Sequence, residues 1–188
     1  MKKVLPFLFQ IIIVSAFGQK PKVELPEFKN TIYIADTVNS KNLQLEKVTA
    51  EIDIKIKSFG YGGSDQSLKI ANNKSTVELS DNQAVFIVKL PEPDIDPSTY
   101  IELYSLTNES DRRSVKLSSR EMFGKTRNVK PTIIELVFTK IETAIYLITP
   151  KNQIIKGSYC FLTDPSAIKS GVSVMSSKST LVFAFDIK

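Results

Sequence analysis

The sequence predicts an all-β protein, a single antiparallel β-sandwich of about 8–10 short strands. In residues 48–58 apolar and charged side chains alternate with a period of two, which is typical of a strand with one buried and one solvated face. Short apolar runs recur at hairpin spacing along the rest of the chain, separated by turn residues. Residues 118–128 carry the one helix signal, the capping-box spacing of Ser118 and Glu121. This pattern favours a sandwich.

Residues 1–18 are predicted to be a cleaved signal peptide that precedes the fold. Two lysines come before the apolar run of residues 4–14, and Ala16 and Gly18 occupy positions −3 and −1 of a cleavage site. A membrane span needs about 20 apolar residues, more than this run supplies. No cysteine follows the cleavage point to carry a lipid anchor. We therefore expect no transmembrane anchor after cleavage and a periplasmic or extracellular location.

The chain after the signal peptide is expected to form one domain. Residues 19–30 contain two prolines and are predicted to be an extended lead-in, and residues 31–188 are predicted to be the β-sandwich domain. Loss of the signal peptide removes two lysines and no acidic residue, so the formal charge falls from +5 to +3. A small charge spread over both signs predicts a mixed, soluble surface and no nucleic-acid partner.

The first half of the domain contains five expected strands, each bounded by turn residues. They are residues 31–35, 48–58, 67–71, 76–79 and 84–90. The glycines of residues 60–63 end the second strand in a bulge or a sharp reversal. Residues 72–74 (Asn-Asn-Lys) form a tight turn between the third and fourth strands. The fifth strand is apolar on nearly both faces, as expected of a central strand covered on both sides.

The second half begins with a loop at residues 91–97, because three prolines there cannot donate to a sheet ladder. Asp96 and Asp164 each begin the tripeptide Asp-Pro-Ser, which predicts the start of a turn. The expected strands that follow are residues 100–106, 114–117, 132–139, 144–149, 154–162 and 181–187. A serine-rich connection precedes the last of them, with a small strand considered at residues 171–175.

Missing residue types exclude several chemistries. The chain has no histidine, which excludes catalytic triads and dyads that use imidazole and the usual zinc sites. The single cysteine, Cys160, cannot form an internal disulfide. It lies between two aromatic residues in a strand-like run, which favours a buried small hydrophobe over a reactive thiol. We expect no catalytic residue, no metal site and no cofactor.

A hydrolase that uses serine or carboxylates is the alternative of a different class. Ser166 and Lys169 fit the pattern S-x-x-K, but the companion motifs of enzymes that use it are missing or misordered. Glu92 and Asp94 in the proline-rich loop supply carboxylates, with the spacing of a solvated turn and not of a calcium loop. This hypothesis requires these four side chains to meet in one cleft.

One segment is considered as a ligand or partner contact, the run Gly60, Tyr61, Gly62 and Gly63. Its backbone N–H groups could bind an anion, and Tyr61 offers an aromatic ring beside them. Glycines at the end of a strand more often serve the geometry of a turn. The sequence does not separate the two interpretations.

Several strand and turn motifs together carry a resemblance. They are Ile32-Tyr33, the run of residues 45–50, residues 59–63 with Leu68, residues 96–98 leading to residues 101–104, residues 157–161, and residues 183–186. In this set the chain resembles a group of uncharacterised exported β-sandwich proteins of Gram-negative bacteria. Lys156 and Ser158 replace the proline and glutamate of that group's P-G-E-Y-x-F motif, so this part of the match is incomplete. The resemblance implies an exported sandwich and names no activity.

These observations lead to one expected function and two alternatives. We expect an exported, non-enzymatic binding or structural module of the cell envelope, whose partner is an unknown protein or glycan. The first alternative is the secreted hydrolase described above. The second is a small outer-membrane β-barrel. The expected strands argue against it, because most of them are shorter than the roughly 9–11 residues that a membrane strand needs.

Overall fold

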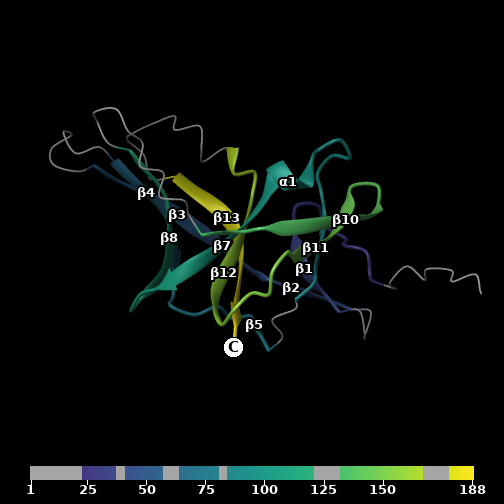
Figure 1. Ribbon diagram of the computed structural model, residues 1–188, viewed down its shortest axis with the longest axis horizontal. Coiled ribbons are helices and arrows are strands. Elements are labelled where there is room, and N and C mark those ends of the chain that lie inside the picture. Colours follow the sequence, from purple (N-terminus) through teal and green to yellow (C-terminus); the bar gives the residue numbers. More distant parts are fainter. Residues whose placement is uncertain (1–22, 37–40, 57–63, 81–83, 121–131, 167–177) are drawn as a thin grey trace, which may run out of the picture.

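The computed structural model describes residues 23–36, 41–56, 64–80, 84–120, 132–166 and 178–188 (Figure 1). Thirteen strands and one short helix are present in these ranges. Every strand pair in them is antiparallel except one, the pair formed by β5 and β13. The predicted all-β, antiparallel class is confirmed.

Six strands close into a barrel, which lies on the left of Figure 1. Each strand bonds to the next around the ring in the order β3-β4-β8-β7-β12-β13, and β13 returns to β3. The bounds are β3 (Glu46–Ile56), β4 (Ser64–Ala71), β7 (Ile101–Asn108), β8 (Arg112–Arg120), β12 (Gly157–Thr163) and β13 (Lys178–Ile187).

Side chains of one parity fill the interior of this barrel. On β3, Ala50 and Ile52 point inward, while Thr49 and Glu51 point to solvent, as the alternation predicted. The buried interior set is Ala50, Ile52, Leu68, Ile70, Tyr104, Leu106, Val115, Cys160, Leu162, Val182 and Ala184. A barrel of this size is therefore a packed core.

Five further strands form a second sheet on the right of Figure 1, in the order β10-β11-β6-β1-β2. The bounds are β1 (Ile32–Ala35), β2 (Asn42–Gln44), β6 (Phe86–Lys89), β10 (Leu136–Glu142) and β11 (Ile145–Pro150). The central strand β6 is buried on both faces: Phe86 and Val88 lie toward the barrel, and Ile87 belongs to a separate cluster on the opposite face. The prediction of a central strand here is confirmed.

Aromatic side chains join the second sheet to the barrel. Strands β12 and β13 point Phe161 and Phe185 outward from the barrel, where both rings meet Phe86 of β6. The ring centroids of Phe86 lie 4.8 Å from Phe161 and 5.1 Å from Phe185. Tyr159 stacks on Phe185 at 5.5 Å. Strands β12 and β13 therefore bury both faces, one in the barrel interior and one against the second sheet.

Three short elements complete the described fold. Strand β5 (Glu78–Leu79) pairs with β13, and β9 (Ile133–Ile134) pairs with β7. Helix α1 (Pro97–Tyr100) begins after Asp96, whose carboxylate accepts a hydrogen bond from the backbone N–H of Ser98 at 2.9 Å. The prediction that Asp96 starts a turn is confirmed.

The predicted single sandwich of about 8–10 strands differs from the fold in two respects. Thirteen strands lie in the described ranges; the predicted run of residues 132–139 is split into β9 and β10, and β2 was not expected. One of the two layers also closes on itself, through pairing of β7 with both β12 and β8. Alternation along a strand is the same in an open sheet and in a barrel, so it does not reveal closure.

Two local expectations are also changed. Residues 67–71 and 76–79 were expected as neighbouring strands around a tight turn, but β4 pairs with β3 and β8, while β5 pairs with β13. Ser118, expected to start a helix, lies in β8 opposite Gln66, and the remainder of that segment from residue 121 lies outside the described residues. Sheet pairing overrides the weak capping signal at this position.

The predicted signal peptide at residues 1–18 and the small strand considered at residues 171–175 lie outside the described residues. In the part of the chain that the structure describes, no helix has the length and apolar character that crossing a membrane requires.

Candidate functional site

Only some of the candidate site residues predicted from the sequence lie within the described ranges. Gly60, Tyr61, Gly62 and Gly63 lie outside them, as does Lys169 of the S-x-x-K pattern. The structure therefore leaves the proposed contact at residues 60–63 as a prediction.

The carboxylates and the serine of the hydrolase hypothesis lie in described segments. Glu92 and Asp94 are exposed in the loop before α1. The hydroxyl of Ser166 donates to the carboxylate of Asp164, within the Asp-Pro-Ser turn. Asp164 has a φ of 54°, a left-handed conformation that suits a turn.

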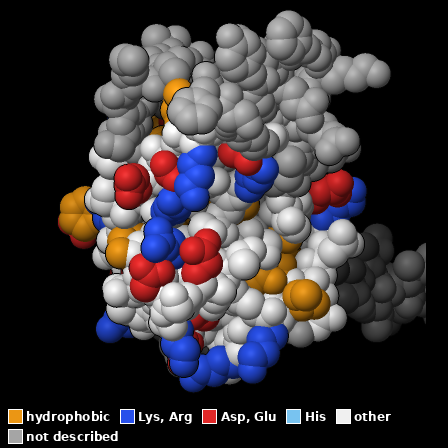
Figure 2. Space-filling model, turned by 90° about the vertical axis from the view of Figure 1, so that its left-hand side faces the viewer, with side chains coloured by type: hydrophobic (Ala, Val, Ile, Leu, Met, Phe, Trp, Pro, Cys, Tyr) orange, Lys and Arg blue, Asp and Glu red, His pale blue; other side chains and the backbone are white. Residues whose placement is uncertain are grey.

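A broad charged face covers the side of the barrel formed by β3, β4 and β8. Figure 2 looks onto this side and shows basic and acidic side chains interspersed over it. Ion pairs link adjacent strands: Lys69 Nζ lies 2.6 Å from Asp53 Oδ2, and Lys116 Nζ lies 2.7 Å from Asp65 Oδ2. The face combines both signs at short range, so it presents no extended field of one charge.

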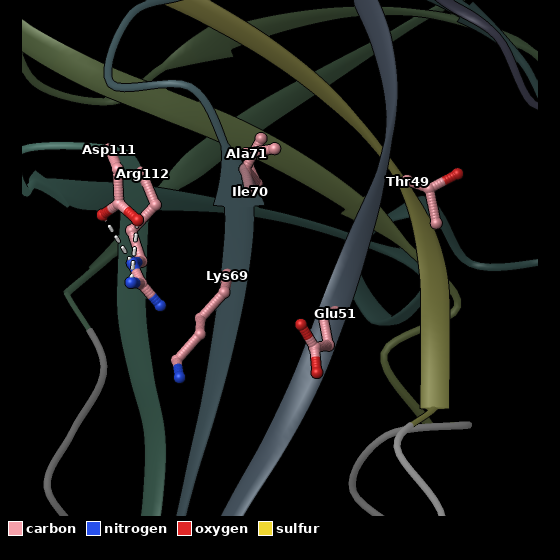
Figure 3. Close-up of a pocket in the computed structure, with 7 residues that line it drawn as sticks. All are labelled: Thr49, Glu51, Lys69, Ile70, Ala71, Asp111 and Arg112. Atoms are coloured by element: carbon pink, nitrogen blue, oxygen red, sulfur yellow. Dashed lines mark hydrogen bonds and ion pairs between the residues drawn. The ribbon is translucent and has the colours of Figure 1, made fainter.

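A shallow hollow of about 330 Å³ lies on this face. We call it the outer-face hollow, and it is lined by Thr49, Glu51, Lys69, Ile70, Ala71, Asp111 and Arg112. Figure 3 shows the side chains of Lys69 and Glu51 on neighbouring strands, with Asp111 and Arg112 on one side and Thr49 on the other. Two acidic and two basic side chains thus meet around one depression.

Arg112 is fixed in the hollow by two hydrogen bonds to one carboxylate. Its Nε and Nη2 atoms donate to Oδ1 and Oδ2 of Asp111, each at 2.9 Å (Figure 3). Glu109 adds a second ion pair to Arg112 at 3.4 Å. The hydrogen bond from Arg112 lowers the pKa of Asp111, and the same contact raises the pKa of Arg112. Both groups are therefore charged at neutral pH.

Lys69 is oriented in the same way from the centre of the hollow. Its hydrogen bond to Asp53 lowers the pKa of that carboxyl below its usual range. Glu51, which lies opposite Lys69 in the β3–β4 ladder, makes no ion pair within the described residues. The hollow therefore combines two oriented cations with one carboxylate that is available to an incoming donor.

The outer-face hollow gathers charged side chains of both signs, which are elements of a binding surface. No protein family model, curated protein or solved structure matches the chain. Within the described ranges, no three acidic, cysteine or histidine side chains gather in a way that could hold a metal ion.

The barrel interior holds two further ionisable groups that are closed to solvent. Burial raises the pKa of the Cys160 thiol to about 12, and Cys160 is fully buried, as the sequence predicted. The hydroxyl of Tyr104 donates to the carboxylate of Glu102. Burial, followed by that hydrogen bond, raises the pKa of Tyr104. Neither group offers an accessible nucleophile.

A group of buried polar side chains lies at one end of the barrel interior, and we call it the buried polar cluster. It comprises Glu46, Ser75, Arg113, Ser158 and Asp186. Arg113 is completely buried; its Nη1 donates to Glu46 Oε2 at 3.1 Å, and its Nε donates to the Asn72 carbonyl at 3.1 Å. Ser75 Oγ donates to the same Glu46 oxygen at 2.6 Å.

Sequence reasoning missed both the outer-face hollow and the buried polar cluster. The charges of the hollow come from β3, β4 and β8, which the alternation identifies as solvated strands without showing that they are neighbours. The buried cluster has a local signal: Arg113 shares its parity with Val115, and Asp186 shares its parity with Val182 and Ala184. A charged residue on the apolar parity of a strand indicates a buried charge that is ion-paired or hydrogen-bonded.

Proposed function

We propose that this protein is an exported, non-enzymatic binding module of the cell envelope, with the outer-face hollow at the centre of its contact surface. The observation that carries the proposal is the meeting of oriented charges of both signs in one depression on a solvent-facing sheet. Preformed charges fix the register of a partner and speed its association. The face lies on the side of the barrel away from the second sheet, where a partner has access (Figure 1).

The packed barrel interior supports an external contact over an internal ligand site. Side chains from all six strands fill it, and Arg113 lies at one end within the buried polar cluster. A membrane barrel has at least eight strands and a polar lumen, so six strands around an apolar core favour a soluble module.

The chemistry of the hollow favours a protein partner over a glycan. Its lining is charged and aliphatic and contains no aromatic ring on which a sugar could stack. A protein segment carrying both a carboxylate and a basic group would complement Arg112 and Lys69 on one side and Glu51 on the other. We therefore propose an envelope protein with a mixed-charge surface as the partner.

The finer description of the fold and the location belong to the same proposal. Packing of the second sheet onto β12 and β13 supports a sandwich-like arrangement in which one layer is closed into a barrel. Export through a signal peptide at residues 1–18 rests on the charge, length and small-residue pattern of that segment.

The test compares two charge-neutral double variants. Glu51→Gln with Arg112→Gln removes one charge of each sign from the hollow. Glu135→Gln with Lys151→Gln does the same at an exposed ion pair beside the second sheet, between the residue before β10 and the residue after β11. A partner is first captured from an envelope extract, identified, purified and titrated against all three proteins. We expect the hollow variant to weaken binding by about tenfold and the control variant to leave it unchanged.

Two results would contradict the proposal. Equal affinities of the wild type and the hollow variant would place the contact elsewhere on the molecule. Turnover of a peptide, ester or glycan by the purified protein would favour the hydrolase alternative.

A further inference from the structure

We propose that the closed end of the barrel contains a binding site for one water molecule, between Asp186 of β13 and Ser158 of β12. These two residues are direct partners in the β12–β13 ladder. Both lie on the parity that points into the barrel, with Ala184 and Cys160. Asp186 is 8% exposed and Ser158 is 1% exposed. The Oδ1 atom of Asp186 and the Oγ atom of Ser158 are buried and have no hydrogen-bond partner in the described part of the chain.

The rest of the buried polar cluster encloses this pair. The backbone N–H of Ser75 donates to Asp186 Oδ2 at 3.0 Å, so only one oxygen of that carboxylate is engaged. The backbone N–H of Asp186 donates to the Val77 carbonyl at 2.9 Å. These contacts hold the connection between β4 and β5 across the end of the barrel. Asp186 Oδ1 and Ser158 Oγ are both closed off from bulk solvent.

A small ligand with both donor and acceptor capacity fits the two unpaired atoms. A carboxylate oxygen only accepts hydrogen bonds, whereas a serine hydroxyl donates one and accepts others. A water molecule can donate to Asp186 Oδ1 and also bond to the Ser158 hydroxyl. Buried waters in proteins typically satisfy polar groups that the chain leaves unpaired, with two to four hydrogen bonds each.

A metal cation fits the same place poorly. Hard cations such as calcium take six or more oxygen ligands, and the two unpaired atoms supply far fewer. The cluster already contains the positive charge of Arg113, which is fully buried. That charge also acts on the Cys160 thiol, two residues along β12 from Ser158. Water adds the missing hydrogen bonds without adding a second positive charge.

The bound water completes the hydrogen bonding of the buried polar cluster. Together with Ser75 it links β12, β13 and the β4–β5 connection, and so it seals one end of the barrel. This role is independent of the outer-face hollow, which lies on the other face of the sheet formed by β3, β4 and β8.

The test is a crystal structure of the wild-type protein, from crystals grown with sodium chloride and then soaked in rubidium chloride. We expect one density peak within roughly 2.6–3.2 Å of both Asp186 Oδ1 and Ser158 Oγ, unchanged in rubidium. An anomalous rubidium signal at the peak would overturn the proposal in favour of a cation. A direct hydrogen bond from Ser158 to Asp186 with no peak between them would also overturn it.

A variant pair checks the assignment in the same crystals. Ser158→Ala removes one of the two hydrogen-bonding atoms, and we expect the peak to be lost or displaced. Ser67→Ala, on the outer face of β4, is the matched control and should retain it. An unchanged peak in the Ser158→Ala protein would show that the hydroxyl does not hold the water and would contradict the proposed site.

Discussion

Arg113 places a full positive charge inside the barrel, and Glu46 is the carboxylate that neutralises it. Replacing Arg113 by methionine leaves the largely buried carboxylate of Glu46 with the Ser75 hydroxyl but without a counter-charge. Removal of one member of a buried ion pair costs about 3–5 kcal/mol, and we expect Arg113→Met to lower the free energy of unfolding by that amount. Urea denaturation measures the change.

The neighbouring arginine supplies the control for this prediction. Arg112 makes its ion pairs on the surface, where such pairs contribute about 0–1 kcal/mol. Arg112→Met should therefore shift the urea midpoint only slightly. Equal losses of stability in the two variants would mean that burial does not distinguish the two arginines.

Cys160 is expected to be unreactive in the folded protein. Its thiol is fully buried, and burial raises its pKa to about 12, so almost no thiolate is present at pH 8. A chromogenic disulfide reagent should label it only as the protein unfolds, and the labelling rate should increase with urea. Rapid and complete labelling of the native protein would contradict the burial of this side chain.

The pair formed by Asp53 and Lys69 predicts a pH dependence of stability. The hydrogen bond from Lys69 lowers the folded-state pKa of Asp53. This contribution is present above the unfolded pKa of about 4 and is lost as the pH falls through the folded-state pKa. Asp53→Asn should therefore lose less stability on acidification than the wild type does. The difference should be less than about 1 kcal/mol, because the pair is partly exposed.

Thermal unfolding between pH 6 and pH 2 measures this effect. Asp94→Asn, in the exposed loop before α1, is the control and should keep the acid dependence of the wild type. If Asp53→Asn loses as much stability on acidification as the wild type, the pair contributes nothing measurable.

Single residues were the least predictable part of the molecule. The sequence identified Cys160 as a buried hydrophobe from its aromatic neighbours, and this is confirmed. Arg113 and Asp186 were missed although each lies on the apolar parity of its strand, because the partner that permits burial of the charge is far away in the chain. For Asp186 that partner is the backbone of Ser75, 111 residues away.

At the scale of elements, β13 is the strand on which both cores depend. Phe185 faces the second sheet and contacts three aromatic rings, while Val182 and Ala184 face the barrel interior. Phe185→Ala should lower the free energy of unfolding by about 3–5 kcal/mol, because it leaves a cavity between the layers. Chemical denaturation followed by circular dichroism measures the loss.

Phe28 is the matched control for this substitution, since its side chain is 60% exposed in the lead-in before β1. Phe28→Ala should change stability by no more than about 0.5 kcal/mol. A small effect of Phe185→Ala would mean that the two layers do not stabilise one another through this ring.

The positions of the strands could be predicted well, but their neighbours could not. The period of two placed β3 and β13 correctly, and the apolar run placed β6 in the centre of a sheet. Alternation shows only which side chains share a face. It does not show that β5 pairs with β13 and not with β4, the strand before it in the chain. Contacts such as that of Ser75 with Asp186 favour the pairing with β13.

At the scale of the whole molecule, the two layers are interleaved along the chain. The barrel takes β3, β4, β7, β8, β12 and β13, and the second sheet takes strands from between and before them. We expect one cooperative thermal transition, because neither layer is a continuous segment that could fold alone. Calorimetry should give equal calorimetric and van't Hoff enthalpies, and two resolved heat-absorption peaks would contradict this expectation.

The same interleaving explains why closure of the barrel could not be predicted from the sequence. An open sandwich and a closed barrel of this length share composition, strand lengths and alternation, and differ in a few pairings such as Thr107 with Ser114. The outer-face hollow could not be predicted for a related reason, because its charges become neighbours only after β3, β4 and β8 pair. The sequence predicts the alternation within each strand but not the order in which the strands pair around the barrel.

The place of β13 in the barrel has a consequence for synthesis of the protein. Strand β13 lies between β12 and β3, so the ring stays open until residues 178–187 have left the ribosome. Throughout translation the nascent chain therefore carries unpaired strand edges and exposed apolar side chains. Until β13 pairs with β12 and β3, these edges and side chains leave the chain prone to aggregation.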